Sequence, residues 1–220
     1  MVKVSVEIKS GWEWAKRAAL RTVGKKPKAD NPMPTSDWKL QALISEHSPI
    51  KLVEYWIDLD DLMQFVGVHL LRHEHTLPYI CSQRSDRNGS PEKTAEEVLS
   101  MIREDIVNDP NFKMENWRHY RLQGSENDHT FVVNAQTLIN ISRRRLCRQA
   151  SKETREAWIL VKDAIASIDE DMAKAMVPNC IYRGFCPEMD CCGFSLSNKY
   201  MEDLLAYRSL IPNEVDRLKK

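Results

Sequence analysis

The sequence predicts an α+β protein that combines a few strands with many helices. Hydrophobic and polar residues alternate from Val2 to Ile8, which is the pattern of a strand with one buried face. Most of the later apolar patterns instead follow the period of an amphipathic helix. Strands and helices do not alternate regularly, so we expect a small antiparallel sheet with several long helices rather than a parallel doubly wound sheet.

The elements of the first half follow from local patterns. A helix is expected from about Trp12 to Val23, followed by a loop rich in Pro, Lys and Asp. Ser36 is expected to cap a second helix, and residues 50–57 are rich in β-forming side chains. Asp60 is expected to cap a third helix.

The middle of the chain has weaker signals. Residues 79–91 begin as an extended segment and end in turn-forming residues. A surface helix is expected over 93–106. Residues 108–129 are polar and rich in turn formers, so we expect the least regular structure there.

The last third is predicted to be helical. A helical pattern starts at Asn134, breaks near Ala150 and continues to about Met176. Two short helices are expected in the tail, over 199–207 and 213–218. We expect one main domain over residues 1–177 and a C-terminal extension over 178–220 that packs on it.

Composition excludes several classes of protein. The chain has 220 residues, and its 32 Lys and Arg balance its 32 Asp and Glu, so no chain-wide basic field for nucleic acid exists. No apolar stretch is long enough to span a membrane, and the N-terminus lacks the apolar region of a signal peptide, so a cytoplasmic location is expected. None of the 7 glycines lies in a Rossmann or Walker phosphate-binding motif.

Cysteines cluster near the C-terminus. Cys180, Cys186, Cys191 and Cys192 lie within thirteen residues of one another. They are candidates for a structural metal site, with Cys147 as a further ligand, or for packed free thiols. We expect packed thiols rather than a metal, because the adjacent Cys191 and Cys192 do not easily bind one tetrahedral ion together.

The sequence HLLRHEH, from His69 to His75, is a candidate anion site. Arg72 and His73 lie at or just beyond the end of a helix, where they could hold a phosphate. His69 and His73 also have the spacing of helical zinc ligands, but Leu70 stands where a zinc protease needs Glu. Alternatively, these side chains are cations that face the negative end of the helix dipole.

Two further segments carry polar groups that could bind a ligand. Ser82 and Arg84 could offer a hydroxyl and a guanidinium to one phosphate, or they could simply form a polar turn. In the helix that starts at Asn134, Arg145 shares a face with Asn134, whereas Arg143 is expected to point into solvent. That face could hold a ligand, or its arginine stems could cover apolar surface. The full set on the face is Asn134, Leu138, Ile141, Arg145 and Gln149.

Three segments together resemble a known family. Arg72-His73-Glu74, seven residues and Ser82-Gln83-Arg84 resemble the Arg-His-Arg hallmark and Ser-x-Arg of the flavin-dependent thymidylate synthases. The stretch Ser48–Leu52 resembles the upstream Ser/Thr-Pro-Phe-Glu-His turn of this family. Asn134-Ala135-Gln136, with Asn140 and Arg145, resembles its downstream helix.

The resemblance implies a homotetrameric methyltransferase of nucleotide biosynthesis. Such an enzyme binds FAD without a glycine loop and converts dUMP to dTMP with methylenetetrahydrofolate and NADPH. It implies that Arg145 and Ser82 are catalytic. The residues implied to line the flavin are Ser48, Arg72, His73, Asn134, Asn140 and Gln149. The residues implied to bind the nucleotide are His69, Ser82, Gln83, Arg84 and Arg145.

The sequence also departs from the family pattern. Glu74 stands in place of the third hallmark residue, Ile80 in place of a Glu, and Gln136 in place of an Arg. These departures leave open C5 hydroxymethylation, methylation of UMP, or a protein that binds nucleotide or flavin without turnover. The cysteine-containing tail resembles phage-type members, which would place the protein in a host cytoplasm.

Overall fold

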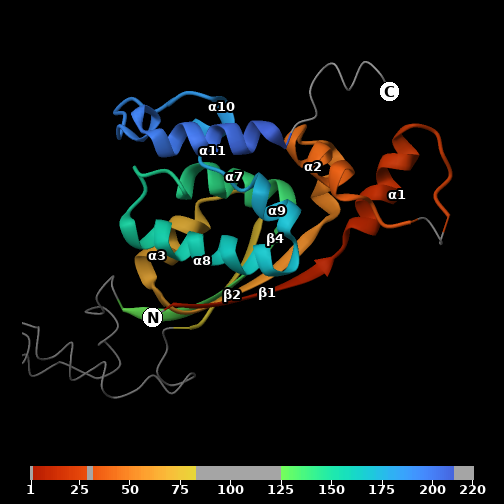
Figure 1. Ribbon diagram of the computed structural model, residues 1–220. Helices are drawn as coiled ribbons and strands as arrows, with labels where there is room; N and C mark the ends of the chain where they lie inside the picture. Colours follow the sequence, from red (N-terminus) through yellow and green to blue (C-terminus); the bar gives the residue numbers. More distant parts are fainter. Residues whose placement is uncertain (1, 29–31, 83–124, 211–220) are drawn as a thin grey trace, which may run out of the picture.

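The protein is built around a four-stranded antiparallel sheet with helices on one side (Figure 1). The computed structural model describes residues 2–28, 32–82 and 125–210. The strand order is β1-β2-β4-β3. The strands are β1 (Lys3–Ser10), β2 (Glu54–Met63), β3 (Thr76–Ile80) and β4 (Glu126–Asn134). The predicted α+β class with a small antiparallel sheet is confirmed.

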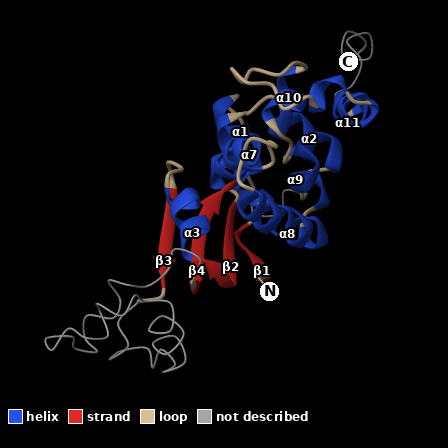
Figure 2. Ribbon diagram, turned by 90° about the vertical axis from the view of Figure 1, so that its left-hand side faces the viewer, coloured by secondary structure: helices blue, strands red, loops and turns tan. Residues whose placement is uncertain are grey.

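The helices form two layers above this sheet. Figure 1 shows α3, α8 and α7 on one side of the sheet, with α10 and α11 farther out, and Figure 2 shows the four strands side by side. The first helices are α1 (Trp12–Thr22), α2 (Ser36–Ile44), the 3-10 helix η1 (Ser48–Leu52) and α3 (Gln64–Leu71). The later ones are α7 (Ala135–Arg145), α8 (Lys152–Ile168), α9 (Glu170–Ala175), α10 (Asn179–Arg183), the 3-10 helix η3 (Phe194–Leu196) and α11 (Asn198–Ser209). None of the helices within the described residues is long and apolar enough to cross a membrane.

Alternation along β2 creates the buried face of the sheet. Tyr55, Ile57 and Leu59 point into the core and are at most 1% exposed. Trp56 lies between them on the opposite face and is 37% exposed. This period of two is what a sheet covered on one face requires.

The central strand β4 lies partly where the sequence predicted little regular structure. Asn127 and His129 point inward in register with the apolar Phe131 and Val133, and all four are buried. Two polar residues at core positions hide the alternation that would otherwise indicate a strand. The expectation for the end of the 108–129 segment was therefore wrong, and the earlier part lies outside the described residues.

Two predicted helix caps are also wrong. The cap of α2 is Thr35, whose side chain accepts a hydrogen bond from the Trp38 amide, and Ser36 is the first helical residue. Asp60 lies within β2, so it caps no helix, and α3 begins at Gln64 without a side-chain cap. Pairing with both β1 and β4 extends β2 beyond the point where its sequence suggests a helix start.

Other boundaries differ from the prediction. The first part of the expected strand 50–57 is the 3-10 helix η1, where Pro49 favours the start of a helical turn. The long helix expected to reach Met176 is divided at Asp169, which ends α8 and caps α9 through a bond from the Met172 amide. The helices expected over 93–106 and 213–218 lie outside the described residues.

Asp169 connects four elements inside the core. Its side chain is about 2% exposed. It accepts hydrogen bonds from Trp12 Nε1 at 2.5 Å and from the Tyr55 hydroxyl at 2.7 Å. Lys39 of α2 lies 3.8 Å away and supplies the balancing charge. Burial, and then the nearby carboxylate, raise the pKa of Tyr55 far above its usual range, so this hydroxyl remains a donor.

We predict that Asp169→Ala lowers the free energy of unfolding by about 3–5 kcal/mol, because it leaves the buried Trp12 and Tyr55 donors without their acceptor. Urea denaturation with an unchanged slope would measure this loss. The control is Asp37→Ala, which removes an exposed carboxylate from the first turn of α2 and should cost no more than about 1 kcal/mol. Equal losses in the two variants would contradict a central role for Asp169.

His129 makes stability depend on pH. Its ring is 1% exposed, stacks on Phe131 and lies against Gly67, where no room remains for a Cβ. Neither ring nitrogen has a hydrogen-bond partner among the described residues. Burial lowers the pKa of His129, although Asp128 partly opposes this, so the folded state favours the neutral ring.

Because the folded pKa is below the unfolded value of about 6.5, this residue destabilises the fold as pH falls below that value. We predict that His129→Phe reduces the loss of stability between about pH 7 and pH 5. Denaturation curves at both pH values would measure the change. His47→Gln, at an exposed position, should leave the pH dependence as it is in the wild type.

Candidate functional site

A basic cavity of about 560 Å³ lies where η1, the end of α3 and the start of α7 meet. Its lining residues are Lys51, Arg72, His73, Glu74, His75, Asn134, Gln136, Thr137, Asn140 and Arg144. Three of these side chains are permanently cationic, and Glu74 is the single carboxylate among them. Such a surface favours an anionic ligand.

The junction between β4 and α7 shapes one wall of this basic cavity. Asn134 ends the strand and caps the helix, with its side-chain oxygen accepting a bond from the Thr137 amide at 2.9 Å. Asn is a favoured cap because its short side chain satisfies an amide that has no partner within the helix. The cap fixes where α7 starts, and therefore how Asn140 and Arg144 face the cavity.

Arg145 lies directly behind His73. Its Nε atom donates to His73 Nε2 at 2.9 Å, and its NH2 group donates to the His69 carbonyl at 2.6 Å. Burial, and then Arg145 and Arg144, lower the pKa of His73 to about 4. The ring is therefore neutral near pH 7, and Nε2 acts as the acceptor.

The arginines around His73 have too few carboxylates near them to balance their positive charge. Neither Arg72 nor Arg145 forms an ion pair within the described residues, whereas Arg144 lies 3.8 Å from Glu188. Burial, and then the positive charges of Arg72 and Arg144, lower the pKa of Arg145. An anion that bound among these cations would relieve their mutual repulsion.

His69 faces the start of α8 as well as the arginine cluster. Its Nδ1 atom lies 2.9 Å from the hydroxyl of Thr154, which also bonds the capping residue Ser151. Burial, Arg145 and Arg72 lower the pKa of His69. Within the described residues, no three side chains that could bind a metal lie together. The hypothesis that His69 and His73 bind zinc therefore has no third ligand there.

The predicted face of α7 is divided between core and site. Leu138 and Ile141 are fully buried, and Arg145 lies beside His73 rather than in the lining of the basic cavity. Gln149 lies beyond the helix end at Arg145, and its side chain donates to the Asp190 carbonyl at 2.5 Å. The structure therefore does not bring Gln149 to the cavity, because the helix ends one turn earlier than its sequence pattern suggests.

The expectation that Arg143 points into solvent is wrong. Its side chain is 15% exposed, forms an ion pair with Glu46 and stacks on the ring of Tyr182. Glu46 also accepts bonds from Gln136 Nε2 at 2.7 Å and from the Tyr182 hydroxyl at 2.9 Å. The C-terminal α10 covers this side of α7, and the sequence of α7 alone contains no sign of that.

The other predicted site residues are only partly placed. Ser48 begins η1 and is exposed outside the lining of the basic cavity, whereas Lys51 of the same turn lies in it. Ser82 is exposed just after β3, and Gln83 and Arg84 lie outside the described residues. The structure thus brings together Arg72, His73, Asn134 and Asn140, with Arg145 behind them.

Sequence reasoning assigned no site role to the other six residues of the cavity lining, namely Lys51, Glu74, His75, Gln136, Thr137 and Arg144. Signals were present in the sequence. Lys51 lies within the Ser48–Leu52 motif, and Arg144 belongs to a run of three arginines. What the helical pattern of α7 does not show is which arginine of the run faces the cavity.

Comparison with known proteins identifies the fold. No protein-family model and no curated protein sequence matches this chain. A crystal structure of flavin-dependent thymidylate synthase ThyX from Helicobacter pylori, complexed with FAD and dUMP, matches with a TM-score of 0.58 at 15% identity, over 79% of this chain and 99% of that one. A second structure of the same enzyme with FAD and dUMP gives a TM-score of 0.55 at 16% identity, over 78% and 100%. The four-stranded antiparallel sheet and its helices therefore have the fold of the flavin-dependent thymidylate synthases.

Proposed function

We propose that this protein is an FAD-dependent thymidylate synthase that methylates dUMP at C5 to give dTMP. Methylenetetrahydrofolate would supply the one-carbon unit, and NADPH would supply the reducing equivalents. The observation that carries the proposal is the cluster of Arg72, Arg144 and Arg145 beside a cavity, in a fold whose solved examples hold FAD and dUMP.

The basic cavity supplies the donors that a flavin dinucleotide needs. Arg72 and Lys51 offer positive charge for its diphosphate. The Asn140 side-chain oxygen accepts bonds from Gln136 and Arg143, which leaves its amide hydrogens to bond an acceptor on the ligand. When bound, FAD carries the hydride chemistry, so the protein has to position it and exclude competing reactions.

Arg145 is the proposed contact to the pyrimidine nucleotide. Its bonds to His73 and to the His69 carbonyl hold the guanidinium in one orientation. A fixed cation placed against the uracil ring would stabilise the negative charge that develops when C5 reacts. Ser82, Gln83 and Arg84 would bind the phosphate, and His69 would lie near the base.

The outer face of the sheet supports the proposed homotetramer. Leu77 and Tyr79 are 57% and 59% exposed, and the Tyr79 ring stacks on Trp56 with centroids 6.2 Å apart. No described helix covers these side chains. An aromatic surface of this kind is typical of protein interfaces, and a second copy of the chain would bury it.

We predict that the purified protein takes up FAD, and that Arg72→Ala weakens this binding about tenfold or more, because a charge-assisted bond contributes roughly 1.5–3 kcal/mol. Quenching of flavin fluorescence would measure the affinity. Arg21→Ala, at the exposed end of α1, is the matched control and should bind as the wild type does. A wild type that takes up no FAD, with or without dUMP, would refute the flavin assignment.

We predict that Arg145→Ala weakens dUMP binding by about ten- to hundredfold while FAD still binds. Calorimetric titration of the FAD-loaded protein with dUMP would test this, again with Arg21→Ala as the control. Turnover is tested separately by adding methylenetetrahydrofolate and NADPH and identifying the product. With dUMP as the substrate, dTMP supports the proposed reaction, and a hydroxymethylated nucleotide would replace it. A parallel assay with UMP would detect methylation of UMP, and tight binding without any product would identify a non-catalytic binding protein.

A further inference from the structure

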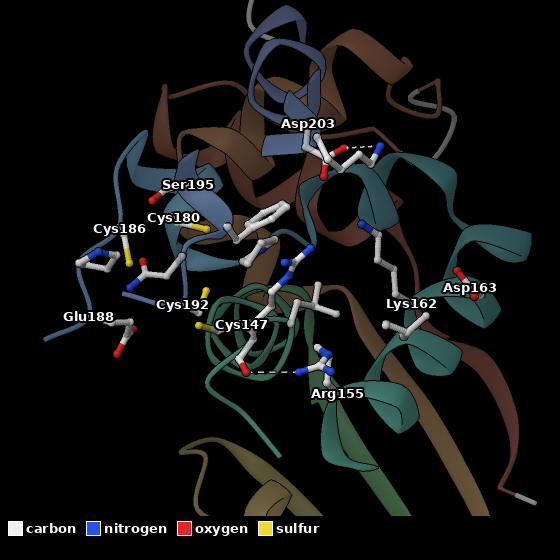
Figure 3. Close-up of a pocket in the computed structure, with 18 residues that line it drawn as sticks. Cys147, Arg155, Lys162, Asp163, Cys180, Cys186, Glu188, Cys192, Ser195 and Asp203 are labelled. Carbon is white, nitrogen blue, oxygen red and sulfur yellow. Dashed lines mark hydrogen bonds and ion pairs between the residues drawn. The ribbon is translucent and has the colours of Figure 1, made fainter. Parts of the chain in front are cut away.

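A second cavity, of about 460 Å³, lies between the end of α7, the helix α8 and the C-terminal segment. Four of the six cysteines line it, and they come from three separate parts of the chain (Figure 3). Cys147 follows α7, Cys180 lies in α10, and Cys186 and Cys192 lie in the loop before α11. The last three are evenly spaced, with five residues between successive cysteines.

Cys191 does not belong to this set. Its sulfur lies 3.4 Å from the Ser195 hydroxyl and 3.4 Å from the Gly193 amide nitrogen, and it also interacts with the Cys186 thiol at the edge of the set. The neighbouring Cys192 lines the cavity instead. Only one of the two adjacent cysteines lines the cavity, so a tetrahedral site there would not need both of them as ligands.

The loop that carries Cys186 and Cys192 lacks an apolar core of its own. From Tyr182 to Lys199 no side chain is buried, and Phe185 and Met189 are 57% and 104% exposed. Its polar links to the rest of the protein include an ion pair between Arg144 and Glu188 at 3.8 Å. The two ends of the segment, at Tyr182 and Phe194, pack against a small apolar cluster, but the part between them buries little to offset its loss of conformational entropy, so a further constraint would stabilise it.

We propose that Cys147, Cys180, Cys186 and Cys192 bind one Zn²⁺ ion in a structural site that fixes the C-terminal extension against α7 and α8. Four thiolates are a standard ligand set for structural zinc, with Zn–S distances of about 2.3 Å. Each thiol releases its proton to solvent as its sulfur binds the ion, so uptake of zinc should acidify an unbuffered solution.

The site closes when the ion binds. Within the described residues, no three side chains that could act as ligands yet lie close enough together to hold a metal. The sulfur atoms instead line the wall of the cavity, which is larger than an ion and leaves room for the side chains to turn inward. This site is separate from the basic cavity, so its test requires neither FAD nor dUMP.

The experiment compares two adjacent cysteines. Elemental analysis of protein purified without chelator should give about one zinc per chain for the wild type and for Cys191→Ser, but loss of the ion for Cys192→Ser. After removal of zinc, titration with Co²⁺ should produce the intense visible absorption of tetrahedral cobalt thiolates in the first two proteins only. Cys180→Ser should behave as Cys192→Ser does.

X-ray absorption at the zinc edge of the wild type keeps the test independent of how well the variants fold. Four sulfur neighbours at about 2.3 Å are expected. A wild type that neither contains zinc nor takes up Zn²⁺ or Co²⁺ would overturn the proposal. So would nitrogen or oxygen ligands in the spectrum, iron with labile sulfide in place of zinc, or loss of the ion in Cys191→Ser.

Discussion

The buried carboxylate of Asp169 holds the two halves of the chain together. It lies at the junction of α8 and α9, yet its partners, Trp12, Lys39 and Tyr55, come from the first 55 residues. A buried charge is costly unless it is paired and hydrogen-bonded, so these partners have to be in place for the fold to form. The strand β2 is fixed by this interaction, and β4, which leads into the basic cavity, pairs with β2.

A second carboxylate, Glu46, links α10 to the cavity wall. It accepts bonds from Gln136 and Tyr182 and pairs with Arg143. Although burial raises the pKa of Glu46, the bonds from Arg143, Tyr182 and Gln136 hold it below its ordinary value. Because Gln136 and Arg143 both contact Asn140, the packing of α10 helps to set how Asn140 faces a ligand.

The basic cavity shows the opposite balance of charge. Arg72, Arg144 and Arg145 lie close enough for their charges to affect one another, and within the described residues only Arg144 has a carboxylate partner, at 3.8 Å. The repulsion between these charges destabilises the free protein, and a bound anion would offset that loss of stability. The core balances its charges at Asp169, whereas the cavity leaves positive charge for a ligand to neutralise.

The sequence by itself determined the α+β class, the first strand, most helices and three of the segments that line the basic cavity. Local periodicity and motif spacing are enough for these, since they depend on neighbours along the chain. The tertiary structure decided those features that depend on contacts between residues far apart in the sequence. Packing of Asn127 and His129 against the core makes a central strand from a polar segment, and contact with Glu46 and Tyr182 buries Arg143. Only the folded structure shows that Cys147 and Cys192 line one cavity and that Cys191 is outside its lining. Contacts between distant segments and side-chain directions in a loop do not follow from a local sequence pattern.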